Sequence, residues 1–424
     1  MSESAMLVGT CIEVDVSAVA HGGFCVARYQ GRVIFVRHAL PGERVRAQIT
    51  EDRGGSFARA DAVQILRASP DRVVPPCEFA GPGRCGGCDW QHVSGPAQRV
   101  LKHAVVTEQF RRLAGLDVSS LLTEVEQLPN AAEESGLLGW RTRITYAVGS
   151  DGRTGLHQHR SHHIEPVDHC PLGVPGVGDS PVLAQQWPGL TGVEPVRDGA
   201  GTLAVLAHRP GPGRQARGRR PPDRIEVVDG PDHLQHELLG RPLQVAASGF
   251  WQVHPAALQS FAQVLLEFLL PRPGEHVLDL YAGAGPLTAV LADAVGTTGR
   301  VVGIESSAQA VADADANLAD QPWAEARRDR VTSELLAALD IRPDLIVLDP
   351  PRAGAGRAVM NSLVDLMPRA IGYVACDPAA LARDAAVVFE RGWVLRRLRA
   401  IDAFPMTHHV ECIALFEPAE PVTG

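Results

Sequence analysis

A cysteine in the setting of a nucleophile stands at Cys376, within the stretch IGYVACDPAALARD (371–384). The apolar residues before it predict a buried strand, Pro378 enforces a turn, and the residues that follow have helical spacing. A thiol between a strand and a helix can lie at the rim of an α/β sheet, where ligands bind, and a helix N-terminus lowers the pKa of a thiol. A lone cysteine is more often a small buried hydrophobe, so the rest of the chain must decide between these roles.

A second candidate for chemistry is Glu411, in DAFPMTHHVECIALFEP (402–418). The pattern predicts a strand over 410–416 that follows a proline turn. Alternation directs Glu411 and Ile413 to the same face, which places an acid beside apolar residues. Burial raises the pKa of a carboxyl group toward the range that suits a general base. The alternative role is a charge on an edge strand.

A glycine-rich turn, DLYAGAG (279–285), lies between a predicted strand and a predicted helix. Asp279 stands just before the turn and Glu305 about 20 residues beyond it, where an acidic residue can bind both hydroxyls of a ribose. A dinucleotide site would need a further glycine where Pro286 stands. S-adenosylmethionine has a ribose but no phosphate, so it suits this turn better. Asp349 ends the strand of PDLIVLDPPRAG at the same crevice, although taken alone it would be a strand-ending cap.

A cysteine cluster in CEFAGPGRCGGCDW (77–90) has the spacing of a metal site. Two residues between cysteines let both thiolates point inward, and nearby glycines let the backbone wrap around them. The available fourth ligand lies farther along the chain, in DHCPL. Four thiolates suit either zinc or a [4Fe–4S] cluster, and the spacing does not separate the two. The four cysteines are Cys77, Cys85, Cys88 and Cys170.

Length and composition bound the class of protein. The 424 residues, of which 45% are hydrophobic, suffice for the cores of about two to four domains. The net charge of −9 gives no global nucleic-acid signature, so any RNA must be bound by local patches. Eight cysteines in so long a chain do not indicate a disulfide scaffold. We find no signal peptide and no membrane-spanning apolar run, and therefore expect a cytoplasmic protein without a membrane partner.

Four segments follow from the changes in periodicity. Residues 1–69 read as short strands between Gly and Pro turns, which is typical of a small OB-like β-barrel. Residues 70–130 hold the cysteines and an amphipathic helix, and residues 131–245 read as a β-rich domain. Residues 246–424 alternate between strand and helix, the pattern of a doubly wound parallel sheet. The predicted fold class is therefore α/β, preceded by a barrel and a β-rich domain.

Two stretches carry basic residues that could contact RNA. OB-like barrels often bind nucleic acid through basic and aromatic positions, although for any one arginine a solvated surface is the commoner role. The loop RPGPGRQARGRRPPDR (209–224) is either a flexible insertion or an RNA-contacting arm. The candidates in the barrel are Arg28, Tyr29, Arg32, Arg37, Arg44 and Arg46.

Taken in order, these motifs resemble the bacterial RNA (uracil-5)-methyltransferases that use S-adenosylmethionine. IFVRHALPGERV (34–45) resembles their TRAM domain, SGFWQVHP (248–255) is similar to S-F-x-Q-V-N-P, and ACDPAALARD (375–384) to S-C-N-P-x-x-L-A-R-D. The resemblance spans nearly the whole chain, ending in a Rossmann-like methyltransferase domain. It implies a nucleophile at Cys376 and a base at Glu411.

The resemblance also implies ligands. It makes the four cysteines ligands of a [4Fe–4S] cluster, with zinc as the alternative. The chain departs from the family pattern at His254, Pro286 and Asp377, where the family commonly has Asn. The residues expected to bind S-adenosylmethionine are Gln252, Tyr281, Gly283, Gly285, Glu305 and Asp349, to which the spacing adds Asp279.

The function implied is methylation of C5 of a uridine in RNA through a covalent bond between Cys376 and C6. The TRAM domain together with the cysteine cluster resembles the members that modify 23S rRNA, whereas the tRNA enzymes of the family typically lack both. A tRNA substrate remains the alternative, as does a non-catalytic RNA-binding iron–sulfur protein on the same fold. No obligate protein partner is inferred.

Overall fold

The computed structural model describes residues 7–130, 136–211 and 222–419, so most of the loop 209–224 lies outside the described residues. Five strands near the N-terminus close into a barrel in the order β1-β2-β3-β5-β4. Alternate residues of β1 are buried and exposed, as expected for a strand with one face toward a core. The OB-like barrel predicted from the sequence is thus confirmed. Its strands are β1 (Cys11–Val19), β2 (Cys25–Tyr29), β3 (Arg32–Arg37), β4 (Arg44–Glu51) and β5 (Phe57–Arg67).

The cysteine segment leads into one long helix and then joins the C-terminal sheet. Helix α1 (Gly95–Gln109) continues into the π-helical turn η1 (Phe110–Ala114), and β6 (Val125–Gln127) follows. Lys102 of this helix is fully buried. Its Nζ donates a hydrogen bond to Oδ1 of Asp402 at 2.5 Å. A buried charge needs such a partner, so this pair ties the helix to the C-terminal domain.

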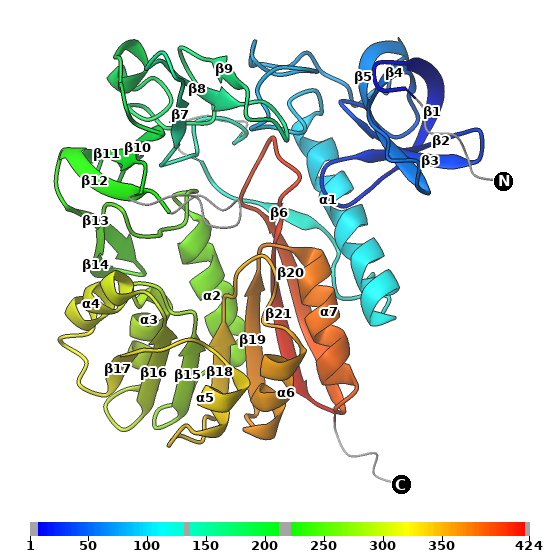
Figure 1. The fold of residues 1–424 in the computed structure, drawn as a ribbon. Helices are drawn as coiled ribbons and strands as arrows, with labels where there is room; N and C mark the ends of the chain where they lie inside the picture. Colours follow the sequence, from blue (N-terminus) through cyan, green and yellow to red (C-terminus); the bar gives the residue numbers. More distant parts are fainter. Residues whose placement is uncertain (1–6, 131–135, 212–221, 420–424) are drawn as a thin grey trace, which may run out of the picture.

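The central region contains a six-stranded antiparallel sheet, in the order β12-β11-β10-β7-β8-β9, and a separate hairpin, β13-β14. In Figure 1 these strands lie above the C-terminal sheet, across from the barrel. The elements are β7 (Tyr146–Val148), β8 (Thr154–His157), β9 (Ile164–Pro166), the 3-10 turn η2 (Pro181–Ala184), β10 (Gly192–Arg197), β11 (Leu203–Arg209), β12 (Arg224–Asp229), β13 (His233–Leu238) and β14 (Arg241–Ala246).

The C-terminal domain is an eight-stranded sheet in the order β17-β16-β15-β18-β19-β21-β20-β6. Strands β15 to β19 run parallel, while β21 is antiparallel to both of its neighbours. The order reverses between β15 and β18, and ligands bind at the carboxyl ends of strands at such a point. The strands are β15 (His276–Leu280), β16 (Arg300–Glu305), β17 (Ala324–Arg328), β18 (Leu345–Leu348), β19 (Ala370–Ala375), β20 (Trp393–Asp402) and β21 (Glu411–Pro418).

Helices cover both faces of this sheet, as a doubly wound fold requires (Figure 1). Val277 of β15 packs into a core with α2 and α3, whereas its neighbour Leu278 packs into the opposite core with α6, α7 and α1. No helix among the described residues is long and apolar enough to cross a membrane. The helices are α2 (Ala257–Leu269), α3 (Pro286–Val295), α4 (Ala308–Asn317), α5 (Ser333–Ala337), α6 (Arg357–Asp365) and α7 (Pro378–Phe389).

The barrel touches the carboxyl end of this sheet through the loop between β1 and β2. His21 Nε2 lies 3.0 Å from Oδ2 of Asp377, the residue that follows Cys376. Gly23 leaves no room for a side chain, because a Cβ there would lie 3.0 to 3.1 Å from atoms of Asp89 and His408. The barrel is therefore packed directly against the turn that carries the predicted nucleophile.

Candidate active site

Cys376 and Glu411, the two predicted catalytic residues, meet at the carboxyl end of β19. Strands β19 and β21 are antiparallel, with Ala375 opposite Cys412. One further step in this register sets Cys376 opposite Glu411. Asp377 caps α7 by accepting a hydrogen bond from the backbone N–H of Ala380 at 2.8 Å, which fixes the turn that holds the thiol.

The environment of the Cys376 thiol differs from the sequence-based expectation. A helix N-terminus was expected to lower its pKa, but the pKa is raised to about 12. Burial is the main cause, and the negative charges of Glu411 and Asp349 add to it, while Arg352 acts in the opposite direction. The negative charge of Asp377 acts in the same direction as burial, Glu411 and Asp349. The thiol of the free protein is held in its protonated form.

Glu411 is a buried carboxyl group whose hydrogen-bonding capacity is not used. Its side chain is 3% exposed, and among the described residues its Oε2 has no hydrogen-bond partner. Burial, reinforced by Asp349, raises its pKa well above the usual value, and Arg352 partly offsets this. An unpartnered buried oxygen costs free energy, and such a carboxyl group is suited to take up a proton.

The glycine-rich turn follows β15 directly, as predicted. Tyr281, Gly283 and Gly285 all have positive φ, of 64°, 57° and 79°. A Cβ on Gly285 would lie 3.0 Å from that of Ala314, so glycine also permits the close approach of α3 and α4. Glu305, at the end of β16, accepts a hydrogen bond from the N–H of Gly283 at 3.2 Å. The predicted ribose-binding carboxylate therefore lies against the turn.

Asp279 lies on β15, and Asp349 lies directly after β18. These are the two neighbouring strands between which the strand order of the sheet reverses, a place that we call the switch point. Asp279 is 1% exposed, and Oγ1 of Thr288 donates a hydrogen bond to it at 2.6 Å. Burial raises the pKa of each carboxyl group to about 7, and Asp279 adds to the effect on Asp349. The geometry thus gives Asp279 a role in supporting the turn, while its contact with the cofactor stays a prediction.

Asp384 is a residue that sequence reasoning missed. Its carboxylate accepts hydrogen bonds from the N–H groups of Ala355 and Gly356, at 2.7 and 3.1 Å, and from the hydroxyl of Tyr373 at 2.8 Å. It therefore holds the loop after Asp349 against α7, the helix that follows the nucleophile. The signal in the sequence was the position of this Asp at the end of the motif ACDPAALARD, within a mostly apolar helix.

Gln252 lies apart from the other predicted cofactor residues. It is 8% exposed and lines a cavity of about 430 Å³ together with residues of the central region such as Thr142 and Asp198. None of the other predicted cofactor-binding residues lines this cavity. The role of Gln252 as a cofactor contact stays a prediction.

The cysteines meet as the spacing predicted. Cys77, Cys85, Cys88 and Cys170 line one cavity of about 210 Å³, and burial raises the pKa of all four thiols. The N–H of Gly87 donates to Sγ of Cys85 at 3.4 Å. No three of these sulfur atoms lie within 4.8 Å of one another, judged over the described residues.

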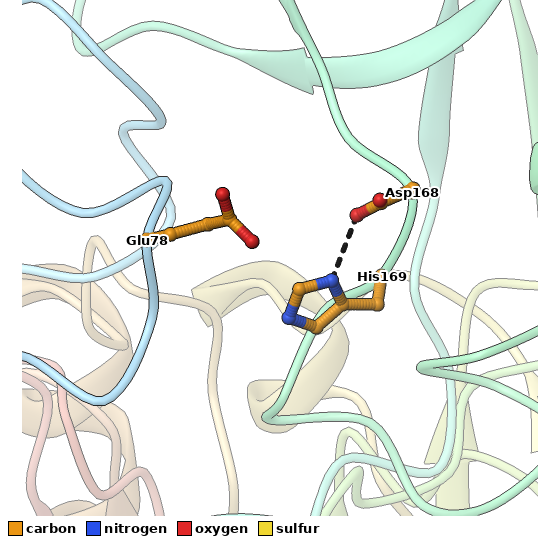
Figure 2. A group of neighbouring side chains, drawn as sticks. All are labelled: Glu78, Asp168 and His169. Carbon is orange, nitrogen blue, oxygen red and sulfur yellow. Dashed lines mark hydrogen bonds and ion pairs between the residues drawn. The ribbon is translucent and has the colours of Figure 1, made fainter.

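A group of exposed side chains borders this cavity. Figure 2 shows the Glu78 carboxylate pointing toward the pair formed by Asp168 and His169, and the three have ligand atoms within 4.8 Å of one another. His169 Nδ1 lies 2.8 Å from Oδ1 of Asp168. Glu78 follows Cys77 in the chain and His169 precedes Cys170, and of the three only His169 lines the cysteine cavity.

Fold and site together define a class I methyltransferase joined to an N-terminal TRAM barrel. Residues 6–63 match the model of the TRAM domain, and residues 251–330 match that of protein-L-isoaspartate(D-aspartate) O-methyltransferase. The crystal structure of the Pyrococcus abyssi tRNA (uracil-54, C5)-methyltransferase, in complex with S-adenosyl-L-homocysteine, has a TM-score of 0.69. The alignment has 20% identity and covers 95% of this chain and 99% of that one, so the whole fold is shared.

Relatives of higher identity give the family. The uncharacterized RNA methyltransferase of Streptomyces avermitilis is 46% identical over 433 residues, 97% of this chain and 99% of its own. That of Streptomyces coelicolor is 47% identical over 440 residues, 99% of this chain and 95% of its own. The chain belongs to this family of RNA methyltransferases. The predicted enzyme class, its S-adenosylmethionine cofactor and an RNA substrate are confirmed at this level.

Proposed function

We propose that this enzyme methylates C5 of a uridine in RNA through a covalent bond between Cys376 and C6 of the base. The observation that carries the proposal is the buried, unpartnered carboxyl oxygen of Glu411 beside this thiol. Addition of a nucleophile to C6 and removal of a proton from C5 need these two groups at one place. A methyltransferase acting on a nitrogen or a hydroxyl group would need neither.

The reaction proceeds through a covalent bond between Cys376 and the base, which is broken again at the end. The Cys376 thiol first loses its proton to solvent. The thiolate then adds to C6, and the electron pair of the C5=C6 bond moves onto the C4 carbonyl as an enolate, so that C5 becomes nucleophilic. S-adenosylmethionine supplies the methyl group that C5 accepts. Glu411 then takes the C5 proton, the C5=C6 bond re-forms, and the thiolate leaves. The target base must be unpaired or flipped out for Cys376 to reach it.

The residues around the switch point suit S-adenosylmethionine. Glu305 keeps free acceptor capacity, because a carboxylate has about four lone-pair sites, and the N–H groups of Gly283 and Ser307 and the hydroxyl of Ser306 use three of them. Tyr281 and Asp349 would border the same ligand. A cationic donor is compatible with carboxylates there, which would hold its ribose and its charge.

We propose 23S rRNA as the substrate class, because the TRAM barrel and the four-cysteine cavity occur together in this chain. A tRNA substrate is the second candidate, favoured by the fold shared with the archaeal tRNA enzyme. Incubation with rRNA and tRNA transcripts and labelled S-adenosylmethionine separates the two.

The position of methylation is tested with RNA that carries tritium at C5 of uridine. We expect release of one tritium for each methyl group transferred, because Glu411 removes the C5 hydrogen. Mass spectrometry of the digested RNA should give 5-methyluridine. Methyl transfer without tritium release would overturn the proposal and point to an oxygen or a nitrogen as acceptor.

We further propose that the four cysteines bind a [4Fe–4S] cluster. The four thiolates around one zinc ion would lie about 3.8 Å apart, given Zn–S bonds of about 2.3 Å. Among the described residues no three of these sulfur atoms lie within 4.8 Å of one another, which is compatible with a cluster, whose four thiolates bind four different iron atoms. Methyl transfer moves no net electrons, so the cluster would have a structural role.

Replacing Cys85 by serine should remove the cluster. We expect anaerobically purified protein to lose its bound iron and sulfide and its visible absorption, and to melt several degrees lower, because cluster binding stabilises the fold. The matched control is Cys11→Ser, which changes an exposed cysteine on the barrel. Zinc in place of iron in the wild-type protein would contradict the cluster.

A further inference from the structure

A cavity of about 860 Å³ lies where the barrel, the cysteine segment and the central region meet. It lies outside the active site, because none of the predicted catalytic or cofactor-binding residues lines it. Phe24 and Phe57 come from the barrel, Arg84 from the cysteine segment, and His159 and Arg160 from the central region. Three parts of the chain that are far apart in sequence thus build one concave surface.

The charge of the cavity is opposite to that of the whole chain. Five arginines line it, against the two carboxylates Glu51 and Asp61, whereas the net charge of the chain is −9. Two of the five, Arg37 and Arg84, form ion pairs with Asp89 and Glu165 outside the lining, so the excess positive charge comes from Arg53, Arg59 and Arg160. Glu51 lies 2.7 Å from Arg59 and 2.9 Å from Arg53, and 3.9 Å from Arg160. One carboxylate shared among three guanidinium groups leaves an excess of positive charge, which attracts phosphate.

The basic residues expected from the sequence differ from those that the structure assembles. Arg32 is 6% exposed and its Nη1 lies 2.8 Å from Oδ2 of Asp52, so it is an interior ion pair of the barrel. Arg44 and Arg46 share Glu13, at 3.4 and 3.5 Å, and neither lines the cavity. Of the six barrel positions named from the sequence, the cavity includes Arg37.

Aromatic rings and arginines are interleaved in this cavity. The guanidinium carbon of Arg59 lies 5.0 Å from the ring centre of Phe57, and that of Arg160 lies 5.6 Å from the ring centre of Phe24. Phe57 is 41% exposed, so its ring is accessible from the cavity. An exposed ring beside guanidinium groups offers a base a surface for stacking and its phosphate a counter-charge.

The cavity adjoins the active site through the loop between β1 and β2. Phe24 lines the cavity, and His21, three residues earlier, contacts Asp377 beside the nucleophile. Three residues of chain span at most about 10 Å. The part of the cavity at Phe24 therefore lies near the turn that carries Cys376.

We propose that this cavity binds an unpaired nucleotide of the RNA substrate, near the methylated uridine in the same strand. The base stacks on Phe57, and Arg53 and Arg160 hold the phosphates. The inference rests on the RNA substrate of the proposed function and adds a second binding site to it. A concave surface with the exposed ring of Phe57 selects single-stranded RNA, because bases in a duplex are stacked on one another.

The test is binding of a short fluorescein-labelled single-stranded RNA of mixed sequence, measured by anisotropy without S-adenosylmethionine. We expect Phe57→Ala to weaken binding about tenfold. Arg160→Ala should weaken it several-fold and lower the slope of log K against log salt by about 0.7, the value for one phosphate contact on a single strand. Phe57→Trp, which keeps a stacking surface, should bind as tightly as the wild type.

The matched control is Arg67→Ala, which removes an exposed barrel arginine, paired with Asp15, that does not line the cavity. Binding by Phe57→Ala and Arg160→Ala equal to that of the control would overturn the proposal, as would equal affinity for the duplex form of the same RNA. Thermal melting of each variant separates loss of binding from loss of fold. Arg160 lies outside the barrel core, so we expect Arg160→Ala to fold as the wild type does. Tritium release by the wild-type enzyme reports on the proposed function independently of these affinities.

Discussion

Replacing Cys376 by alanine is expected to abolish methyl transfer, with kcat/KM falling at least about a thousandfold. Without the thiolate, no bond forms at C6 and C5 of uracil stays a poor nucleophile. The other residues of the site remain in place, because Cys376 follows β19 and Asp377 still caps α7. Binding of S-adenosylmethionine, measured by calorimetry, should change little. The decisive measurement is transfer of a labelled methyl group to RNA.

The matched control is Cys412→Ala, which removes a neighbouring buried thiol from β21. This substitution should cost some stability but leave methyl transfer within a few-fold of the wild type. Methylation of uridine by Cys376→Ala at a rate near that of the wild type would contradict the covalent mechanism, and it would return Cys376 to the role of a small buried residue.

Replacing Glu411 by glutamine is expected to stop the reaction after methyl transfer. An amide has nearly the shape of the carboxyl group but cannot take the C5 proton, so Cys376 cannot leave. Turnover should fall by about 10² to 10⁴. Protein covalently bound to RNA should accumulate and be visible as a slower band on a denaturing gel. The double variant with Cys376→Ala should give no such band.

The same residue sets the expected pH dependence of the wild-type enzyme. Glu411 must be ionised to accept a proton, and its pKa is raised, so activity should increase with pH through that raised pKa. The raised pKa of the Cys376 thiol acts in the same direction, because the thiolate is the reactive form. If Glu411→Gln turned over at the wild-type rate and gave no covalent band, Glu411 would have no part in the mechanism.

Local patterns were enough to predict the elements and the motif residues at their ends. The alternation around Glu411 predicted a buried carboxyl group, and the period change near residue 246 predicted the doubly wound sheet. Cys376 was placed correctly between a strand and a helix. What the sequence could not give was the register between β19 and β21, which sets Cys376 opposite Glu411. Register depends on packing between distant segments.

Electrostatic effects were predicted less well, because they sum over neighbours from several strands. The helix N-terminus at Cys376 is a local feature, whereas the charges of Glu411 and Asp349 that oppose it come from other elements. For the same reason, the role of Asp384 was missed. Its partners lie in the loop after β18 and on β19, and only the fold brings them to α7.

The burial of Lys102 against Asp402 has a consequence for how this enzyme could be engineered. Strand β6 forms the edge of the C-terminal sheet, next to β20. Lys102 neutralises Asp402 at the end of β20, although the lysine itself lies outside the segment 246–424. Excising that segment would expose an open sheet edge and leave a carboxylate without its counter-ion. We therefore expect that the segment 246–424 cannot be fused to another RNA-binding domain without losing stability.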